Sequence, residues 1–200
     1  MSPPGGDRPA EDPRTSAADV RVRAATPDDV ALIHGFIVEL AVYERAPDQV
    51  TGTPALLAAA LFGATPSAEA LIAELDGVAA GFALFHGTFS TWKCLPGIWL
   101  EDLYVPVAHR RSGVGRALLA RLAQLTVQRG CARLEWHALD WNTPALDFYE
   151  QIGAARLSEW ELHRLDGVAL RRVANGPTLA GPPPGRPFGA PPGDLTGPGG

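Results

Sequence analysis

Lysine, cysteine and long apolar runs are all scarce in this 200-residue chain. Lys93 is the single lysine, and 22 acidic residues outnumber 17 basic ones, so the net charge is −5. A chain without a basic excess does not fit a general nucleic-acid binder. Two cysteines, Cys94 and Cys131, are too few for a disulfide framework. The apolar run from Ala55 to Phe62 is too short to span a bilayer, which predicts no membrane segment.

The N-terminus also lacks the marks of an export signal. Residues 2–6 read Ser-Pro-Pro-Gly-Gly, with neither a basic stretch nor an apolar one. Hydrophobic residues make up 46% of the chain and charged residues 20%, a composition that can fill a core. We therefore expect a soluble, cytoplasmic protein with one folded domain.

The two ends differ from the middle in composition. Residues 1–19 are rich in Pro, Gly and Asp, and residues 174–200 hold 8 Gly and 8 Pro. Such segments bury too little apolar surface to offset the entropy lost on ordering. The sequence thus predicts disordered ends around a folded domain at 20–173. A Pro-rich tail can also bind a partner that recognises polyproline helices, although a tail without a binding role is favoured.

Apolar periodicity within 20–173 alternates between strand and helix patterns. The resulting fold class is α+β, a mixed sheet with helices on both faces. Thr26 before Pro27 is typical of a helix start, and Asp76-Gly77 is typical of a hairpin turn. The strands are expected at 20–24, 70–75, 78–86, 98–105, 133–138, 160–165 and 169–173, and the helices after Pro27, at 54–61, at 113–129 and at 144–152.

One strand-to-helix junction carries a chemical signal. A strand ends at Val105, a turn rich in Arg and Gly follows, and a long helix begins near Gly113. Glycines without Cβ atoms let an anion approach the backbone, and the amides and dipole of a helix N-terminus face it. Arginines add charge-assisted hydrogen bonds. Together with Arg110, Arg111 and Arg116, this junction predicts a pyrophosphate site.

Four segments of the chain resemble one enzyme family. The Arg110-x-x-Gly113-x-Gly115 loop resembles the acetyl-CoA-binding motif of the GCN5-related N-acetyltransferases, and residues 142–153 resemble that family's Asn-x-x-Ala-x-x-Phe-Tyr-x-x-x-Gly segment. The closer likeness is to the diamine (spermidine/spermine or thialysine) acetyltransferase subgroup. It rests on four segments that occur in the order the subgroup has: 39–44, 100–105, the Arg/Gly loop and 141–144.

The resemblance implies a fold, a co-substrate and a set of binding residues. The fold is a three-layer α/β/α arrangement around a mostly antiparallel, V-splayed sheet, with acetyl-CoA between two central strands. No metal is implied, a small-molecule amine is the expected substrate, and the subgroup implies a homodimer. The implied cofactor-binding residues are Leu103, Val105, Arg110, Arg111, Ser112, Gly113, Val114, Gly115, Arg116, Asn142 and Tyr149.

Acetyl transfer to an amine sets the catalytic roles. A primary ammonium has a pKa near that of lysine, about 10, and must lose a proton before it attacks a thioester. Glu101 is the candidate base, and strict alternation places Asp102 on the opposite face of the strand. The departing thiolate benefits from a proton donor, and the Tyr149 hydroxyl is the candidate acid.

Alternatives remain open at several of these positions. Tyr43, Glu44 and Glu101 are candidate acceptor-binding residues, and Glu44 and Asp48 are equally compatible with a solvated helix end and loop. Glu101 is as compatible with a structural carboxylate as with a base. Tyr149 is also compatible with core packing, although the resemblance favours the acid role. The five histidines show no metal-ligand spacing. The acceptor alternatives are a polyamine, a lysine-like amino acid, an antibiotic and a protein amine; the rival from another class is a non-catalytic acyl-CoA-binding module.

Overall fold

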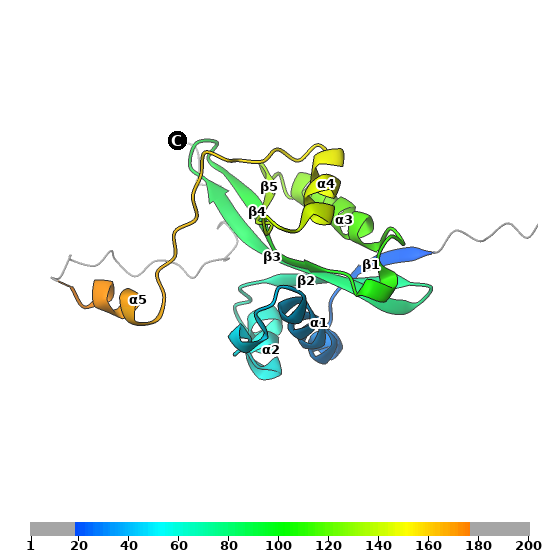
Figure 1. Cartoon of the computed structure of the whole chain (residues 1–200), viewed down its shortest axis with the longest axis horizontal. Helices are drawn as coiled ribbons and strands as arrows, with labels where there is room; N and C mark the ends of the chain where they lie inside the picture. The colour runs from blue at the N-terminus through cyan, green and yellow to red at the C-terminus, as the bar shows by residue number, and fades with distance from the viewer. Residues whose placement is uncertain (1–18, 177–200) are drawn as a thin grey trace, which may run out of the picture.

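The computed structural model describes residues 19–176 as a three-layer structure (Figure 1). A five-stranded sheet in the order β1-β2-β3-β4-β5 forms the middle layer. Helices α1 and α2 cover one face, and α3 and α4 lie on the other side (Figure 1). The expected α+β architecture is confirmed.

The element bounds follow the predicted order for most of the chain. The strands are β1 (Val20–Ala24), β2 (Glu69–Leu75), β3 (Val78–Ser90), β4 (Leu95–Tyr104) and β5 (Leu134–Trp136). The helices are α1 (Val30–Tyr43), α2 (Pro54–Phe62), α3 (Val114–Gln128), α4 (Thr143–Gln151) and α5 (Gly167–Ala174), with short 3-10 turns at Pro27–Asp29, Pro47–Gln49 and Val107–His109. Strands β1 to β4 pair antiparallel, and β4 pairs with β5 in parallel.

Local polar contacts explain why the first elements start where they do. The backbone N–H and hydroxyl of Thr26 both donate to the Asp29 carboxylate, at 2.7 and 2.9 Å. Arg23 on β1 pairs with the same carboxylate at 2.7 Å and with Glu74 on β2 at 2.7 Å. The Arg23 guanidinium holds the pKa of the buried Asp29 well below its usual range. This cluster joins the first two strands to the beginning of the helical layer.

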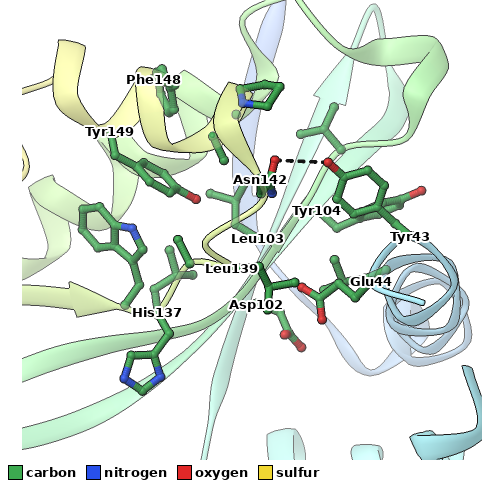
Figure 2. A pocket seen from close by; sticks show the side chains of 18 of the residues that line it. Tyr43, Glu44, Asp102, Leu103, Tyr104, His137, Leu139, Asn142, Phe148 and Tyr149 are labelled. Carbon is green, nitrogen blue, oxygen red and sulfur yellow. Dashed lines mark hydrogen bonds between the residues drawn. The ribbon is translucent and has the colours of Figure 1, made fainter. Parts of the chain in front are cut away.

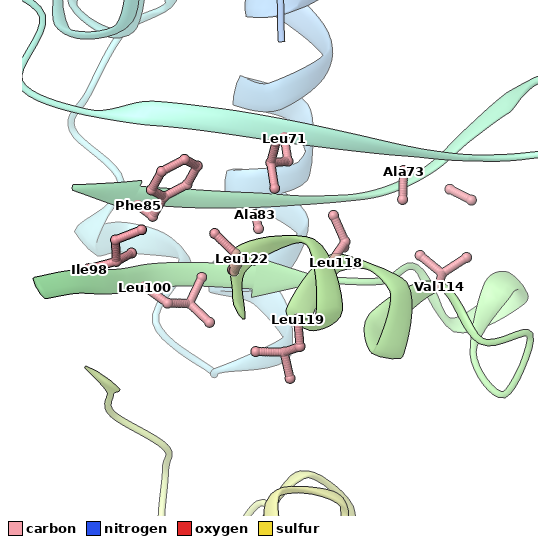
Figure 3. Close-up of a cluster of buried hydrophobic side chains, with 11 residues drawn as sticks. Leu71, Ala73, Ala83, Phe85, Ile98, Leu100, Val114, Leu118, Leu119 and Leu122 are labelled. Atoms are coloured by element: carbon pink, nitrogen blue, oxygen red, sulfur yellow. The ribbon is translucent and has the colours of Figure 1, made fainter. Parts of the chain in front are cut away.

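Each face of the sheet carries its own apolar core. On one face, Leu118 and Leu122 of α3 pack fully buried against Phe85, Ile98 and neighbouring strand residues (Figure 3). On the other, Ile33 and Phe36 of α1 pack against Ile72, Phe82 and Tyr104. Helix α3 is therefore held firmly on the sheet, and its N-terminus is fixed beside the end of β4.

The two strands predicted at 160–165 and 169–173 are wrong. Residues 155–166 contain neither helix nor strand, and Gly167–Ala174 forms α5, which begins after Asp166 as N-cap. A short apolar run with spacings of three and four residues fits a helix as well as a strand, and no strand among residues 19–176 pairs with this segment to select the extended form. All residues from 155 to 175 are exposed.

The predicted domain limits fall close to the edges of the described region. The N-terminal extension at 1–19 lies outside the described residues except for Asp19, and the tail at 174–200 does so from residue 177 onward. The limit at 173 falls inside the last turn of α5. Within 19–176, no helix combines the length and apolar character needed to cross a membrane.

Candidate active site

A cavity opens where β4 and β5 separate. The two strands pair only at Ile98↔Leu134, Trp99↔Glu135 and Leu100↔Trp136. Beyond these pairs, β4 continues to Tyr104, whereas the segment that follows β5 turns away from β4 toward α4. The resulting cavity has a volume of about 970 Å³ and is lined from both sides of the split. This volume lies at the upper end of the range for ligand sites in proteins.

A bulge in β4 shapes one wall of the cavity. Leu84 of β3 faces Asp102 and Phe85 faces Leu100, so Glu101 is an extra residue without a partner. A bulge interrupts the alternation of side chains along a strand. Glu101 and Asp102 consequently both line the cavity, whereas strict alternation predicts Asp102 on the opposite face. That prediction for Asp102 is wrong because it assumed a regular strand.

The predicted anion site lies at one end of the cavity. Gly113 is the N-cap of α3 with φ +90°, and Arg111 before it is also left-handed at φ +65°. A Cβ on Gly115 would lie 3.8 Å from Val105 and 3.9 Å from Leu103, which is ordinary contact. The first amides of a helix have no intrahelical partner. Gly113 is therefore required by backbone conformation, and Gly115 keeps the approach to these amides clear.

The other residues of the Arg/Gly loop divide between cavity and core. Side chains of Arg110, Arg111 and Arg116 line the cavity, as do Leu103 and Val105 on β4. The Ser112 hydroxyl instead donates to the His109 carbonyl at 2.5 Å, and Val114 is buried in the core beneath α3. Ser112 and Val114 can thus offer only their backbone groups to an anion.

A hydrogen bond between α1 and the start of α4 crosses the cavity. The Tyr43 hydroxyl donates to Oδ1 of Asn142 at 3.1 Å, joining residues 99 positions apart (Figure 2). The Arg110 guanidinium lies 4.5 Å from the Tyr43 ring centre, and its Nε donates to the Val105 carbonyl at 3.2 Å. The structure therefore brings together residues predicted for acceptor binding and for cofactor binding.

Tyr149 on α4 faces the cavity from the side opposite Tyr43. Its hydroxyl points into the space between the two walls (Figure 2). The edge of its ring meets Trp136 with 5.1 Å between centres, and Phe148 lies 5.7 Å away. Burial raises the pKa of this phenol above its ordinary value of 10. The hydroxyl consequently keeps its proton at neutral pH and remains a donor.

Three carboxylates lie near one another along the cavity: Glu44, Glu101 and Asp102. Burial, with a smaller contribution from the neighbouring charges of Glu101 and Glu44, raises the pKa of Asp102 to about 6. Burial also raises the pKa of Glu44. Glu101 is more exposed and accepts a hydrogen bond from the Trp99 indole at 2.9 Å. Removal of like charges from water disfavours ionisation, and a cation bound here would reverse that cost.

Two cavity residues were missed by the sequence analysis. Asp102 is displaced into the cavity by the bulge, which depends on the register of β3 against β4. His137 lines the cavity and packs edge-on against Trp99 at 4.5 Å. No motif marks either residue, and the only local signal was the adjacent pair of acids at 101 and 102. Within residues 19–176, no three His, Cys, Asp or Glu side chains are placed so that they could hold a metal ion together.

Residues 27–154 match the acetyltransferase (GNAT) family. The chain belongs to this family. It is an N-acetyltransferase, as its relatives in the family are, and the members of this family use acetyl-CoA as co-substrate. The likeness to the diamine acetyltransferase subgroup is also confirmed.

Individual relatives agree with the family assignment. The chain is 36% identical to a thialysine N-epsilon-acetyltransferase from Bos taurus, over 78% of this chain and 98% of the relative. It is 31% identical to an L-ornithine N5-acetyltransferase from Arabidopsis thaliana, over 86% and 98%. An integron cassette protein from V. cholerae has a similar solved structure, with TM-score 0.66 and 27% identity over 78% of this chain and 98% of that one.

Proposed function

We propose that this GNAT enzyme transfers the acetyl group of acetyl-CoA to a primary amine of a small molecule that carries a second positive charge. The observation behind the proposal is that one cavity has opposite electrostatic ends. Helix amides and arginines form one end, and Glu44, Glu101 and Asp102 form the other. A phosphate ester suits the first end and a cationic amine suits the second.

Acetyl-CoA fits the residues at the anion end. The amides of residues 111–116 can hold the pyrophosphate, with Arg111 and Arg116 beside it. Because β4 has no strand partner on its cavity side after Leu100, Leu103 and Val105 can offer backbone hydrogen bonds to the pantetheine arm. Asn142 on the facing wall is the proposed side-chain contact, which requires it to share or release the Tyr43 hydroxyl.

Tyr149 is the proposed acid of the reaction. The amine nitrogen attacks the thioester carbonyl carbon, the new C–N bond forms, and the C–S bond breaks. The sulfur leaves as a thiolate and takes a proton from the Tyr149 hydroxyl, which points into the cavity (Figure 2). A general acid of this kind contributes about 10²–10⁴-fold to rate.

Glu101, acting through water, is the proposed base, and the structure favours Asp102 as its partner in that role. The charge of Glu101 raises the pKa of Asp102, so the two side chains are close enough to influence one another. Asp102 is the less exposed of the two, and its pKa of about 6 is closer to neutral pH than that of an ordinary carboxyl. A base with a pKa near the working pH accepts a proton more effectively than a strongly acidic one.

The acceptor class rests on the charge at the carboxylate end and on the relatives. Thialysine and ornithine, which name two relatives, each carry a second amine beyond the one acetylated. A polyamine, a lysine-like amino acid, an aminoglycoside-type antibiotic and a protein amine remain acceptor alternatives, and a non-catalytic acyl-CoA-binding module remains the alternative outside catalysis. Tyr43 and Glu44 are the proposed acceptor contacts.

A matched pair of amines tests the proposal directly. The enzyme is incubated with acetyl-CoA and either 1,5-diaminopentane or 1-aminopentane, and free-thiol release is followed. The two acceptors differ only in the second amine. A hydrogen-bonded interaction with a charged group is worth about 1.5–3 kcal/mol, so kcat/KM should be at least about tenfold higher for the diamine.

The other outcomes separate the alternatives. Equal kcat/KM for both amines would contradict recognition of a second charge while leaving acetyl transfer intact. Acetyl-CoA binding by calorimetry without thiol release, across a panel that includes ornithine, lysine, spermidine and an aminoglycoside, would favour the non-catalytic module.

A further inference from the structure

The side chains of His86, Trp99 and Glu101 lie together where β3 and β4 pair. His86 on β3 stands directly opposite Trp99 on β4, and directly opposed residues project their side chains from the same face of a sheet. Trp99 also contacts Glu101, two residues further along β4. Glu101 is the bulge residue, so no partner on β3 fixes its position. Its orientation therefore depends on contacts of its side chain.

Both of these contacts reach the same oxygen of the Glu101 carboxylate. The Trp99 indole N–H donates to Oε2 at 2.9 Å, and Nε2 of His86 lies 3.7 Å from the same Oε2. Among the residues that the structure describes, none forms a hydrogen bond with Oε1. A carboxylate anchored through one oxygen presents the other in a defined direction.

The two anchoring side chains are themselves held in place. Trp99 pairs with His86 on one side and with Glu135 of β5 on the other, and its ring meets the His137 ring edge-on at 4.5 Å between centres. The Nδ1–H of His86 donates to the Gly87 carbonyl at 3.2 Å, because a carbonyl oxygen can only accept. The second ring nitrogen, Nε2, is consequently the one that faces Glu101.

Glu101 needs such anchors to keep one orientation. Its side chain is 56% exposed, and an exposed glutamate has several rotatable bonds and many accessible conformations. Asp102 lies close enough for the Glu101 charge to raise its pKa, and like charges repel. Without donors on Oε2, repulsion and rotational freedom would both move the Glu101 carboxylate toward solvent.

We propose that Trp99 and His86 are positioning residues for acetyl transfer. They hold Oε2 of Glu101 and thereby present Oε1 to the water molecule or the ammonium group that gives up the proton. The inference rests on the proposed role of Glu101 as base. The proton passes from the ammonium to Oε1, directly or through water, and then to solvent, while the indole keeps its own proton throughout. Trp99, with the shorter contact, contributes more than His86.

A double-mutant cycle tests the role of Trp99. Trp99→Phe keeps an aromatic ring beside His137 and removes the indole donor, so kcat should fall about tenfold because the base is displaced. In the Glu101→Gln background the same change should lower kcat by less than about twofold, because no base remains to be positioned. Acetyl-CoA affinity, measured by calorimetry, should change by less than about twofold in every variant.

Substitutions at His86 test the weaker contact. His86→Leu should lower kcat about two- to fivefold, and His86→Gln, which keeps an N–H donor, should restore most of the parental rate. His34→Leu is the matched control, because His34 on α1 contacts the Gly52 carbonyl and does not line the cavity. Its kcat should equal that of the parent.

Three kinetic outcomes would overturn the inference, and they fall at different points of the argument. An equal loss on Trp99→Phe in both backgrounds would assign Trp99 a structural role. A parental rate in Trp99→Phe, with Glu101→Gln slowed, would remove the positioning role and leave the base in place. A parental rate in Glu101→Gln would overturn the proposed base and the inference with it.

A spectroscopic measurement tests the anchoring contact without any activity. The Trp99 indole N–H resonance is assigned, among those of the five tryptophans, by its absence from the ¹H–¹⁵N spectrum of Trp99→Phe. It should move upfield in Glu101→Gln, because a neutral amide is a weaker acceptor than a carboxylate. Asp48→Asn, an exposed change of the same kind, should leave it in place. A Trp99 resonance that does not move in Glu101→Gln would show that the contact is absent in solution, and the inference would be wrong.

Discussion

The chain up to Thr126 and the chain after it differ sharply in burial. All buried residues of the described region lie at or before Thr126, in β2 to β4, in the helices α1, α2 and α3, and at Asp29 in the 3-10 turn before α1. After that point β5 and α4 are half-buried at most, and every residue from 155 to 175 is exposed. The first part contains both apolar cores, while the second part supplies Asn142, Tyr149 and the exposed segment that ends in α5.

This difference places both buried cores in the first part, whereas the cavity is lined by residues of both parts. The second part covers the cavity with side chains that are at most half-buried. Each prediction below tests one side of that division.

The largest effect is expected in the core under α3. Leu118 is 0% exposed, and Leu118→Ala should lower the free energy of unfolding by about 2–5 kcal/mol because it leaves a cavity. The same change at Leu139, which is 38% exposed in the second part, should cost less than about 1 kcal/mol. Urea denaturation of both variants measures the contrast, and equal costs would contradict the division.

A charge at the α3 N-terminus should remove acetyl-CoA binding with little effect on folding. Gly115→Asp places a carboxylate where the pyrophosphate is proposed, and affinity by calorimetry should fall about a hundredfold or more. Gly115→Ala is the control that adds a Cβ without a charge; it should fold as the parent does, because the Cβ makes only ordinary contacts within the protein, and it should lose far less affinity than Gly115→Asp. Unchanged affinity in Gly115→Asp would place the phosphates elsewhere. Gly113→Asp should also lose affinity, although its left-handed φ adds strain.

Removal of the Tyr149 hydroxyl should slow the chemical step. Tyr149→Phe keeps the ring against Trp136 and Phe148, so unfolding free energy and acetyl-CoA affinity should hardly change. Turnover should fall at least about tenfold. A parental rate, measured with chemistry rate-limiting, would identify Tyr149 as a packing residue of the cavity wall.

The acidic limb of the pH–rate profile should report the ionisation of Asp102 and the effect of the Glu101 charge on it. With Asp102 titrating near pH 6, kcat/KM should rise through that pH. Glu101→Gln should slow the reaction least at high pH, and it should shift the limb to lower pH because the Glu101 charge raises the pKa of Asp102. Asp102→Asn should abolish the limb, while the exposed Asp48→Asn serves as control. An unshifted profile in Glu101→Gln would contradict the coupling.

The same titration has a smaller effect on stability, with a defined sign. The pKa of Asp102 is higher in the folded chain than in the unfolded one, where a carboxyl titrates near about 4. The protonated form therefore stabilises the fold fully below pH about 4, and this contribution is lost as pH rises through about 6. Asp102→Asn should flatten this decline in urea titrations at pH 4 to 7.

The elements that the sequence predicts best are local ones. The anion loop depends on a strand end, two glycines and a helix start within a dozen residues, and all of these are confirmed. The hairpin at Asp76-Gly77 is confirmed for the same reason, since both residues have the positive φ that the turn requires.

The features that escaped prediction depend on distant partners. The bulge at Glu101 follows from the register of β3 on β4, and the Tyr43–Asn142 contact joins segments 99 residues apart. Neither can be read from local pattern. The segments 160–165 and 169–173 were wrongly predicted as strands because apolar and polar residues alternate there, whereas no strand of the described residues pairs with them.

The three-residue pairing between β4 and β5 has a mechanical consequence. Because only three residue pairs join β5 to β4, few backbone hydrogen bonds hold β5 and the following α4 to the rest of the sheet. A ligand bound between β4 and α4 would contact both and hold them together. Amide hydrogens in Leu134–Trp136 and Thr143–Gln151 should then exchange rapidly without ligand and slow markedly with it, while those of α3 stay protected throughout. Binding of the co-substrate would then stabilise β5 and α4, the elements that line its own site.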